Sequence, residues 1–270
     1  ITEDRLLGNL DVEQLLKEGK QHFIPGLVAK AHRQILYIDE VNLLPDHIID
    51  DILDVSAMGW NQIEREGFSV SHPADFLLIG TMNPEEGELR PQILDRFPLS
   101  VEISSVTNAT YRKEIINRNL AYEKDADDFI AQFKPETENL KKLIELSRDL
   151  LPQVEIEDHF YDLIVKLCSE YKIDGHRADI AIIKTAQTHA AFELKKLVEL
   201  RHLQQAAKFV LQHRTRDGGF SKALTKTEIE DFFQAQSTEA TPALSDTKKG
   251  EIDKTIGLFQ AGVLIQPEKK

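Results

Sequence analysis

The sequence lacks several features that would assign its class at once. Its 270 residues include a single cysteine, Cys168, which excludes an internal disulfide. No apolar run approaches the roughly 18 residues that a membrane-spanning helix needs. Acidic residues outnumber basic ones by 46 to 33, and the net charge of −13 disfavours binding to a nucleic-acid backbone. We therefore expect a soluble, cytoplasmic protein that binds neither membranes nor nucleic acid.

A phosphate-binding loop of the form Gly-x-x-x-x-Gly-Lys-Ser/Thr is also absent. The Gly-Lys pair of the chain is Gly19-Lys20, but Gln21 follows it and Gln14 stands where the motif begins with glycine. Without this loop, the backbone N–H groups and the lysine that surround nucleotide phosphates are missing. The chain alone is therefore expected to be inactive as a nucleoside triphosphatase.

What the sequence does contain is typical of a globular protein. Hydrophobic residues make up 41% and charged residues 29%, and the length suffices for a core domain and a helical domain. Cys168 shares a predicted helix face with Leu163, Ile164 and Leu167. This spacing favours a buried, unreactive thiol.

Two adjacent acids follow the apolar run 35–38, whose length suits a parallel strand covered on both faces. Ligands bind at the carboxyl ends of such strands. Acids at this position cost stability unless something pairs with them, commonly Mg²⁺ on nucleotide phosphates. Asp39 is then a candidate magnesium ligand, and Glu40 a candidate general base that polarises the attacking water. The alternative is a pair of solvated acids.

A second apolar run, 76–80, predicts a neighbouring strand and is followed by Thr81, Met82, Asn83 and Pro84. If the strands are parallel neighbours, Asn83 lies at the same edge as the two acids and can orient a water or contact the terminal phosphate. Its alternative role is a cap or turn residue before Pro84. A helix from Pro45, with Ile48, Ile49, Ile52, Leu53 and Val55 on one side, completes a crossover unit.

The connection between this helix and the second strand, 59–75, is too long for a simple turn. Its pattern predicts a β-hairpin insertion at about 60–74, with its turn at Glu66-Gly67. Insertions on a rigid core often face a partner.

The run 83–97 reads Asn-Pro-Glu-Glu-Gly-Glu-Leu-Arg-Pro-Gln-Ile-Leu-Asp-Arg-Phe. Together with 35–44, and with Ile-Glu-Arg-Glu-Gly before His-Pro-Ala in 63–74, it closely resembles the ATPase subunit I of magnesium chelatase. That family belongs to the AAA+ ATPases and is close to the MoxR-type chaperones. The resemblance extends over about 1–216 and is densest up to 103. It implies an α/β fold, a parallel-sheet AAA+ core followed by an all-α lid.

The resemblance implies a role for each candidate residue of the core. Asp39 and Glu40 match the Walker B acids, and Asn83 matches sensor 1. Arg96 matches the arginine finger, which reaches the nucleotide of the neighbouring subunit. From the residues alone, Arg96 could instead form a surface ion pair with Asp95 or a glutamate.

Arg177 matches the sensor 2 arginine of the lid, although the family usually has Leu and Gly where this chain has His176 and Ala178. The residues also single it out independently. A cation in the first turn of a helix opposes the helix dipole by a few tenths to about 1 kcal/mol, so an anion should compensate. The alternative is a local ion pair with Asp174 or Asp179.

The expected domains are 1–104 for the C-terminal part of the core, 105–216 for the lid, and 217–270 for a linker and tail. Within 125–138 the chain is polar and acidic, and 225–228 predicts a capping box. Composition predicts a linker at 234–249 and an apolar docking segment at 252–265. The amphipathic helices are expected at 107–123, 140–151, 156–171, 176–197 and 200–213.

The resemblance implies the ATPase motor of a magnesium chelatase, with ATP and Mg²⁺ as cofactors. Such subunits form a homo-oligomer, a hexameric ring, and couple hydrolysis to Mg²⁺ insertion into protoporphyrin by chelatase partner subunits. In the family, a strand, the P-loop helix and a second strand precede the segment that begins at Ile1. We therefore expect the C-terminal part of a longer gene product, with a divergent full-length protein as the alternative.

Two other functions stay open at this point. One is a MoxR-type ATPase that remodels or matures other proteins, which uses the same ATPase residues. The other is a non-hydrolysing ring scaffold that has lost its P-loop, against which the retained acids and arginines count. The acidic net charge counts against AAA+ helicases and clamp loaders.

Overall fold

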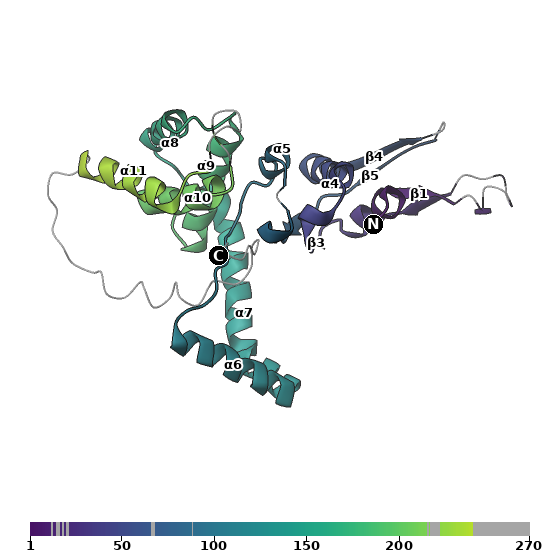
Figure 1. Ribbon diagram of the computed structural model, residues 1–270, viewed down its shortest axis with the longest axis horizontal. Helices are drawn as coiled ribbons and strands as arrows, with labels where there is room; N and C mark the ends of the chain where they lie inside the picture. Colours follow the sequence, from purple (N-terminus) through teal and green to yellow (C-terminus); the bar gives the residue numbers. More distant parts are fainter. Residues whose placement is uncertain are drawn as a thin grey trace. The chain divides into compact units, whose positions relative to one another are not determined.

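The computed structural model describes residues 1–11, 13, 14, 17, 19, 22–65, 68–87, 89–214, 216 and 222–239. The described chain forms two compact units. The first comprises 1–96 and 101–103, and the second comprises 97–100 and the described residues between 104 and 239. The fold is the expected α/β class, with a parallel strand pair in the first unit and helices throughout the second (Figure 1).

The first unit alternates short helices and strands. Among its described residues, three two-stranded sheets pair β1 with β2 and β4 with β5 in antiparallel fashion, and β3 with β6 in parallel. The parallel register joins Ile35 to Leu77 and Ile38 to Gly80, which confirms the expected neighbouring strands. The elements are α1 (Glu3–Leu7), β1 (Gly8–Leu10), β2 (Phe23–Pro25), α3 (Leu27–Lys30), β3 (Ile35–Ile38), η1 (Val41–Leu43), α4 (Asp46–Met58), β4 (Trp60–Arg65), β5 (Phe68–Pro73), β6 (Leu77–Gly80), η2 (Pro84–Glu86) and α5 (Pro91–Leu94).

One face of β3 is exposed, so the prediction of a strand covered on both faces is wrong for this structure. Ile35 and Tyr37 are 59% and 58% exposed, whereas Leu36 and Ile38 pack against the core. The β3–β6 sheet has two strands in the described residues, and only the face toward α4 is covered. A continuous apolar run therefore does not by itself prove two covered faces.

Helix α4 contributes Ile48, Ile52 and Val55 to that core. Pro45 caps α4 instead of beginning it, one residue from the expected start. The helix ends at Met58, and the C-cap residue Gly59, whose positive φ of 70° suits glycine, turns the chain into β4. The apolar side of α4 is buried as predicted, with Ile48, Ile49, Ile52, Leu53 and Val55.

The insertion at 60–74 is the predicted β-hairpin, in which Ile63 pairs with Val70 and Arg65 with Phe68. Its predicted turn at Glu66-Gly67 lies outside the described residues. The buried Asn61 amide donates to the Leu7 carbonyl over 3.0 Å, which ties the hairpin base to the end of α1.

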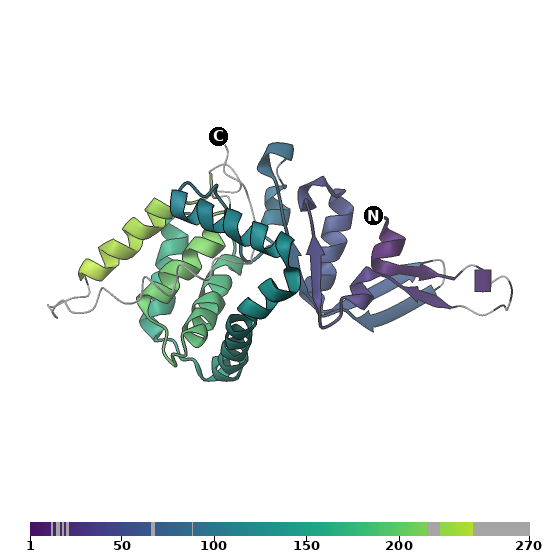
Figure 2. The ribbon, with the colours of Figure 1, turned by 90° about the horizontal axis from the view of Figure 1, so that it is seen from below.

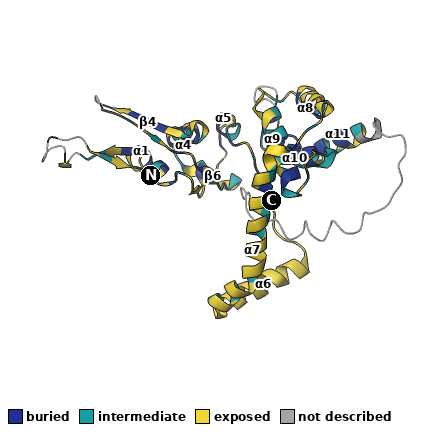
Figure 3. Ribbon diagram, turned by 180° about the vertical axis from the view of Figure 1, so that it is seen from behind, coloured by how far each residue is buried: buried dark blue, intermediate teal, exposed yellow. Residues whose placement is uncertain are grey.

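The second unit is helical. Its core lies among α8–α11, which gather into one bundle (green to yellow in Figure 2). Helix α6 has no buried residue, so the predicted apolar side of this helix is exposed (Figure 3). The elements are α6 (Ala109–Lys124), α7 (Ala126–Leu150), η3 (Leu151–Gln153), α8 (Asp158–Glu170), α9 (Arg177–Phe192), α10 (Leu200–Leu211) and α11 (Lys226–Glu239).

Several helix bounds differ from the expected ones. Helix α7 begins at Ala126 and includes the acidic stretch, because the Asp125 side chain caps it by accepting from the Asp128 N–H over 3.0 Å. Helix α9 ends at Phe192 instead of 197. The predicted linker at 234–249 is in part helical, since α11 extends to Glu239, and the rest of it lies outside the described residues, as does 252–265.

The predicted capping box at the start of α11 is confirmed. The Glu228 N–H donates to Thr225 Oγ1 over 3.2 Å, and the Thr225 N–H donates to Glu228 Oε2 over 2.8 Å. Hydrogen bonds from Thr225 hold the pKa of the Glu228 carboxyl below its usual value.

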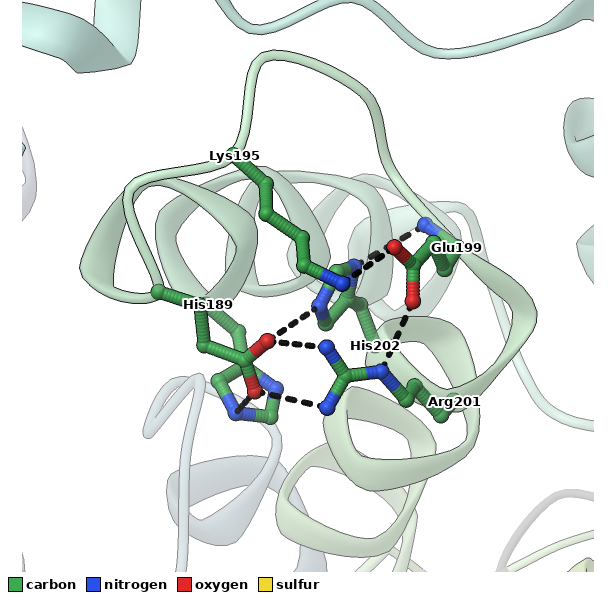
Figure 4. A network of polar contacts seen from close by, with 6 residues as sticks. His189, Lys195, Glu199, Arg201 and His202 are labelled. Carbon is green, nitrogen blue, oxygen red and sulfur yellow. Dashed lines mark hydrogen bonds and ion pairs between the residues drawn. The ribbon is translucent and has the colours of Figure 1, made fainter. Parts of the chain in front are cut away.

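A polar network joins the end of α9 to the start of α10 (Figure 4). Arg201 donates to both Glu193 oxygens and, over 2.8 Å, to Glu199. The fully buried His202 accepts from the Glu199 N–H over 2.9 Å and contacts Glu193 over 3.2 Å. Hydrogen bonds from Arg201 and Lys195 lower the pKa of Glu199 to about 2. The network fixes the 193–199 connection by charge-assisted hydrogen bonds.

Cys168 is buried, as predicted, and burial raises the pKa of its thiol far above the ordinary value. None of the described helices is long and apolar enough to cross a membrane.

Adjacent residues of α8 provide a test of this core. Ile164 is 1% exposed and Val165 is 57% exposed. Ile164→Ala is expected to lower the free energy of unfolding by about 2–5 kcal/mol, because it removes buried methyl groups and leaves a cavity. Val165→Ala should change it by about 0.5 kcal/mol or less. Urea denaturation followed by circular dichroism measures both, and equal effects would contradict the described packing.

Candidate functional site

The parallel pairing brings the ends of β3 and β6 together. Beyond the last paired residues, Thr81 Oγ1 donates to Asp39 Oδ1 over 2.6 Å, and the Tyr37 hydroxyl donates to the same oxygen over 3.1 Å. The hydrogen bonds from Thr81 and Tyr37 lower the pKa of the exposed Asp39 carboxyl. Asp39 is therefore ionised at neutral pH and presents an oxygen that a cation can bind.

Glu40 adopts a left-handed backbone conformation, with φ 52° and ψ 55°. Such a conformation costs about 1–3 kcal/mol outside glycine and persists only where neighbouring contacts hold it. Here the Glu40 N–H donates to Thr81 Oγ1 over 3.0 Å, and the next N–H, of Val41, donates to the Thr81 carbonyl over 2.8 Å. The carboxylate of Glu40 itself is exposed.

Asn83 caps η2, because its side chain accepts from the Glu85 N–H over 3.1 Å. This is the alternative role that the sequence left open. The Asn83 carbonyl accepts from the side chain of Asn42 over 3.2 Å, and the same amide donates to the Gly87 carbonyl over 3.1 Å. Asn42 thereby links the loop after β6 to the turn after Glu40. The role of Asn83 toward a nucleotide stays a prediction.

Arg96 follows α5 and turns toward α4 of its own chain. Its guanidinium lies 2.5 Å from Asp54 Oδ1 and 3.8 Å from Asp50 Oδ1, and its side chain is one third exposed. The sequence had suggested Asp95 or a glutamate as the alternative ion-pair partner, so the partner residue differs. The partner belongs to α4 because α5 is a single short turn that ends beside that helix.

Arg177 belongs to the second unit, where it is the exposed first residue of α9. The loop before it ends at Gly175, whose φ of 70° suits glycine. The Asp179 carboxylate lies 3.6 Å from His176 Nδ1. The role of Arg177 as sensor 2, and its alternative as a local ion pair, both stay predictions.

The donor set fits magnesium on a nucleotide better than a metal held by protein alone. Within the described part of the chain, no three His, Cys, Asp or Glu side chains form a group that could hold a metal ion. Magnesium is commonly held by one or two carboxylates together with substrate phosphates and waters. Asp39 and Glu40, adjacent and exposed at the strand end, suit that mode.

Sequence reasoning missed Thr81, Tyr37 and Asn42. The signal for Thr81 was available, because it follows the second strand at the level where Asp39 follows the first. Asn42 gave no such signal, since its partners are backbone carbonyls of a loop.

Comparisons with protein families match two parts of this chain. The family model described as magnesium chelatase, subunit ChlI, matches residues 12–92, and an AAA lid domain model matches 161–232.

The chain is also similar to whole proteins. It is 46% identical to a magnesium-chelatase subunit ChlI homolog of Methanocaldococcus jannaschii, over 86% of this chain and 64% of the relative. It is 43% identical to a magnesium-chelatase 38 kDa subunit of Acidiphilium rubrum, over 90% of this chain and 70% of the relative.

Among solved structures, a candidate ATPase from Cytophaga hutchinsonii superposes with a TM-score of 0.57 at 19% identity, over 88% of this chain and 72% of that one. This likeness supports the fold. The chain spans 64%, 55% and 35% of the length of three of its curated relatives.

Proposed function

The chain belongs to the magnesium chelatase subunit ChlI family, and from this premise we propose that it is part of the ATPase motor of a chelatase-type complex. The observation that carries the proposal is the joined end of β3 and β6, where Asp39 and Glu40 meet Thr81. This arrangement presents two acids at the edge where parallel sheets bind ligands, and hydrogen bonds lower the pKa of one of them, Asp39.

Each residue of the site has a distinct role in the proposed reaction. Asp39 binds Mg²⁺ on the nucleotide phosphates, and the ion, when bound, neutralises charge on those phosphates. Glu40 accepts a proton from the attacking water. Asn83 orients that water or contacts the terminal phosphate, once its cap to the Glu85 N–H is exchanged for this contact.

Arginines complete the proposed site. Arg96 stabilises the transition state in a neighbouring copy of the chain, within a hexameric ring. Arg177 couples the nucleotide to movement of the helical lid. The ring transmits the energy of hydrolysis to partner subunits, which insert Mg²⁺ into protoporphyrin. That the relatives are named as subunits supports such partners.

Magnesium insertion is the experiment that tests this function. In a gene product that supplies the P-loop, the wild type with porphyrin-binding partner subunits of the same organism should produce fluorescent magnesium protoporphyrin with ATP. Glu40→Gln should keep nucleotide binding and lose about 10²–10⁴ in ATPase rate, because the water loses its base while Asp39 remains. An unchanged rate would remove Glu40 from the mechanism. ATPase activity without insertion would favour a MoxR-type role.

A separate test measures ATP hydrolysis by the chain alone. Purified residues 1–270 contain no P-loop and should hydrolyse ATP at the rate of buffer, measured by phosphate release. Steady turnover that Glu40→Gln abolishes would contradict the requirement for a P-loop.

Arg96 should act in trans. In the same P-loop-containing gene product, Arg96→Ala should assemble, bind ATP and lose about 10³–10⁵ in rate. Mixing Arg96→Ala with Glu40→Gln should restore partial ATPase activity, because some interfaces then join an intact Glu40 to an intact Arg96. The trans role would be contradicted by one pair of results. Assembled mixtures of the two variants would show no ATPase activity, whereas mixtures that also contain wild-type subunits would show it.

Asp54→Asn is the matched control for the local ion pair of Arg96. It removes the same exposed pair and keeps the arginine, so it should retain most of the ATPase rate. A loss equal to that of Arg96→Ala would mean that the pair itself, and not a contact with a neighbour, accounts for the effect.

A further inference from the structure

All polar groups of Thr81 form hydrogen bonds with one segment, residues 38–41, at the end of the neighbouring strand β3. Its N–H donates to the Ile38 carbonyl over 2.9 Å, and its carbonyl accepts from the Val41 N–H over 2.8 Å. Its hydroxyl donates to Asp39 Oδ1 over 2.6 Å and accepts from the Glu40 N–H over 3.0 Å. Each residue from 38 to 41 therefore makes one hydrogen bond with Thr81: Ile38 and Asp39 accept, and Glu40 and Val41 donate.

The two backbone bonds lie just beyond the last paired residues of the ladder and need no particular side chain. The two hydroxyl bonds are different, because only a side chain with a donor and an acceptor on one atom can make both. Serine and threonine carry such a hydroxyl at this distance from the backbone. Valine has the shape of threonine and makes neither bond.

The hydroxyl also links the two acids in one geometry. Since its proton is committed to the Asp39 carboxylate, its lone pair faces the Glu40 N–H. That N–H belongs to the residue in the left-handed conformation, which needs external support. Tyr37 also donates to Asp39, but it lies on the same strand and cannot fix the acids relative to β6.

We propose that Thr81 is a positioning residue, whose hydroxyl sets the carboxylate of Asp39 and the backbone of Glu40 in the arrangement that serves a magnesium nucleotide. The part that concerns the nucleotide rests on the proposed function. The part that concerns the geometry of the two acids does not.

Amide hydrogen exchange of the chain 1–270, followed by NMR, tests the geometry. In Thr81→Val the Glu40 amide should exchange about 2–10-fold faster, as expected from the loss of one hydrogen bond. Thr81→Ser should restore the rate to that of the wild type. Thr188→Val is the matched control, because it removes a threonine hydroxyl that donates to the Lys184 carbonyl of its own helix, and it should leave the exchange at Glu40 unchanged.

Circular dichroism establishes that each variant is folded, and Thr81→Ala replaces Thr81→Val if the valine variant is not. Unchanged exchange at Glu40 in a folded variant without the hydroxyl would overturn the proposal. Exchange in Thr81→Ser as fast as in Thr81→Val would do so too, because shape and not the hydroxyl would then hold the turn.

ATP hydrolysis by a gene product that supplies the P-loop tests the consequence. Thr81→Val should lower kcat by about tenfold or more, with KM for ATP changed by about twofold or less, and Thr81→Ser should recover kcat. A loss confined to KM would contradict the positioning role. If the wild type itself hydrolyses no ATP, the proposed function fails, while the exchange at Glu40 still decides whether Thr81 holds the acids.

Discussion

The parallel register of β3 and β6 is the constraint on which the rest of the first unit depends. Because Ile38 lies opposite Gly80, the next residues along each strand, Asp39 and Thr81, meet as a pair. A shift of one residue would reverse the faces of every side chain on the moved strand. It would also separate the threonine hydroxyl from the acid. Helix α4 secures this register, since its buried side packs against the inward residues of both strands.

The helical unit is organised differently, by a close-packed core and a polar network. Small residues such as Ala186 and Ala207 are fully buried in the α8–α11 core and let the helices approach closely. Glu193 and Arg201 lock the chain between α9 and α10. Ala178, the second residue of α9, is also fully buried in this core and anchors the start of the helix. A residue in the role proposed for Arg177 needs such an anchored position if it is to report on a ligand.

The sequence predicted the elements of the site better than their contacts. Apolar runs identified both strands, and the i, i+3, i+4 pattern identified α4, because burial imposes these periods directly. The acids of 125–138 misled, because the stretch also carries Phe129, Ile130 and Phe133 at helical spacing and begins at a good cap, Asp125. The exposed face of β3 could not be predicted, because an apolar run does not reveal what covers it. The ion pair of Arg96 with Asp54 could not be predicted either, because it joins residues 42 positions apart in the sequence through a short exposed contact.

That ion pair bears on how an arginine can serve a neighbouring subunit. A long cationic side chain loses conformational entropy whenever it is held in one position, so an arginine that waits disordered must lose that entropy when it binds. Asp54 and Asp50 hold Arg96 at a partly exposed position in the isolated chain. Exposed ion pairs are worth only about 0–1 kcal/mol, whereas Arg–phosphate bonds are charge-assisted and bidentate. In the proposed trans role, exchange of the aspartates for a phosphate would therefore cost little free energy, and α4 would retain the arginine until a neighbouring copy presents one.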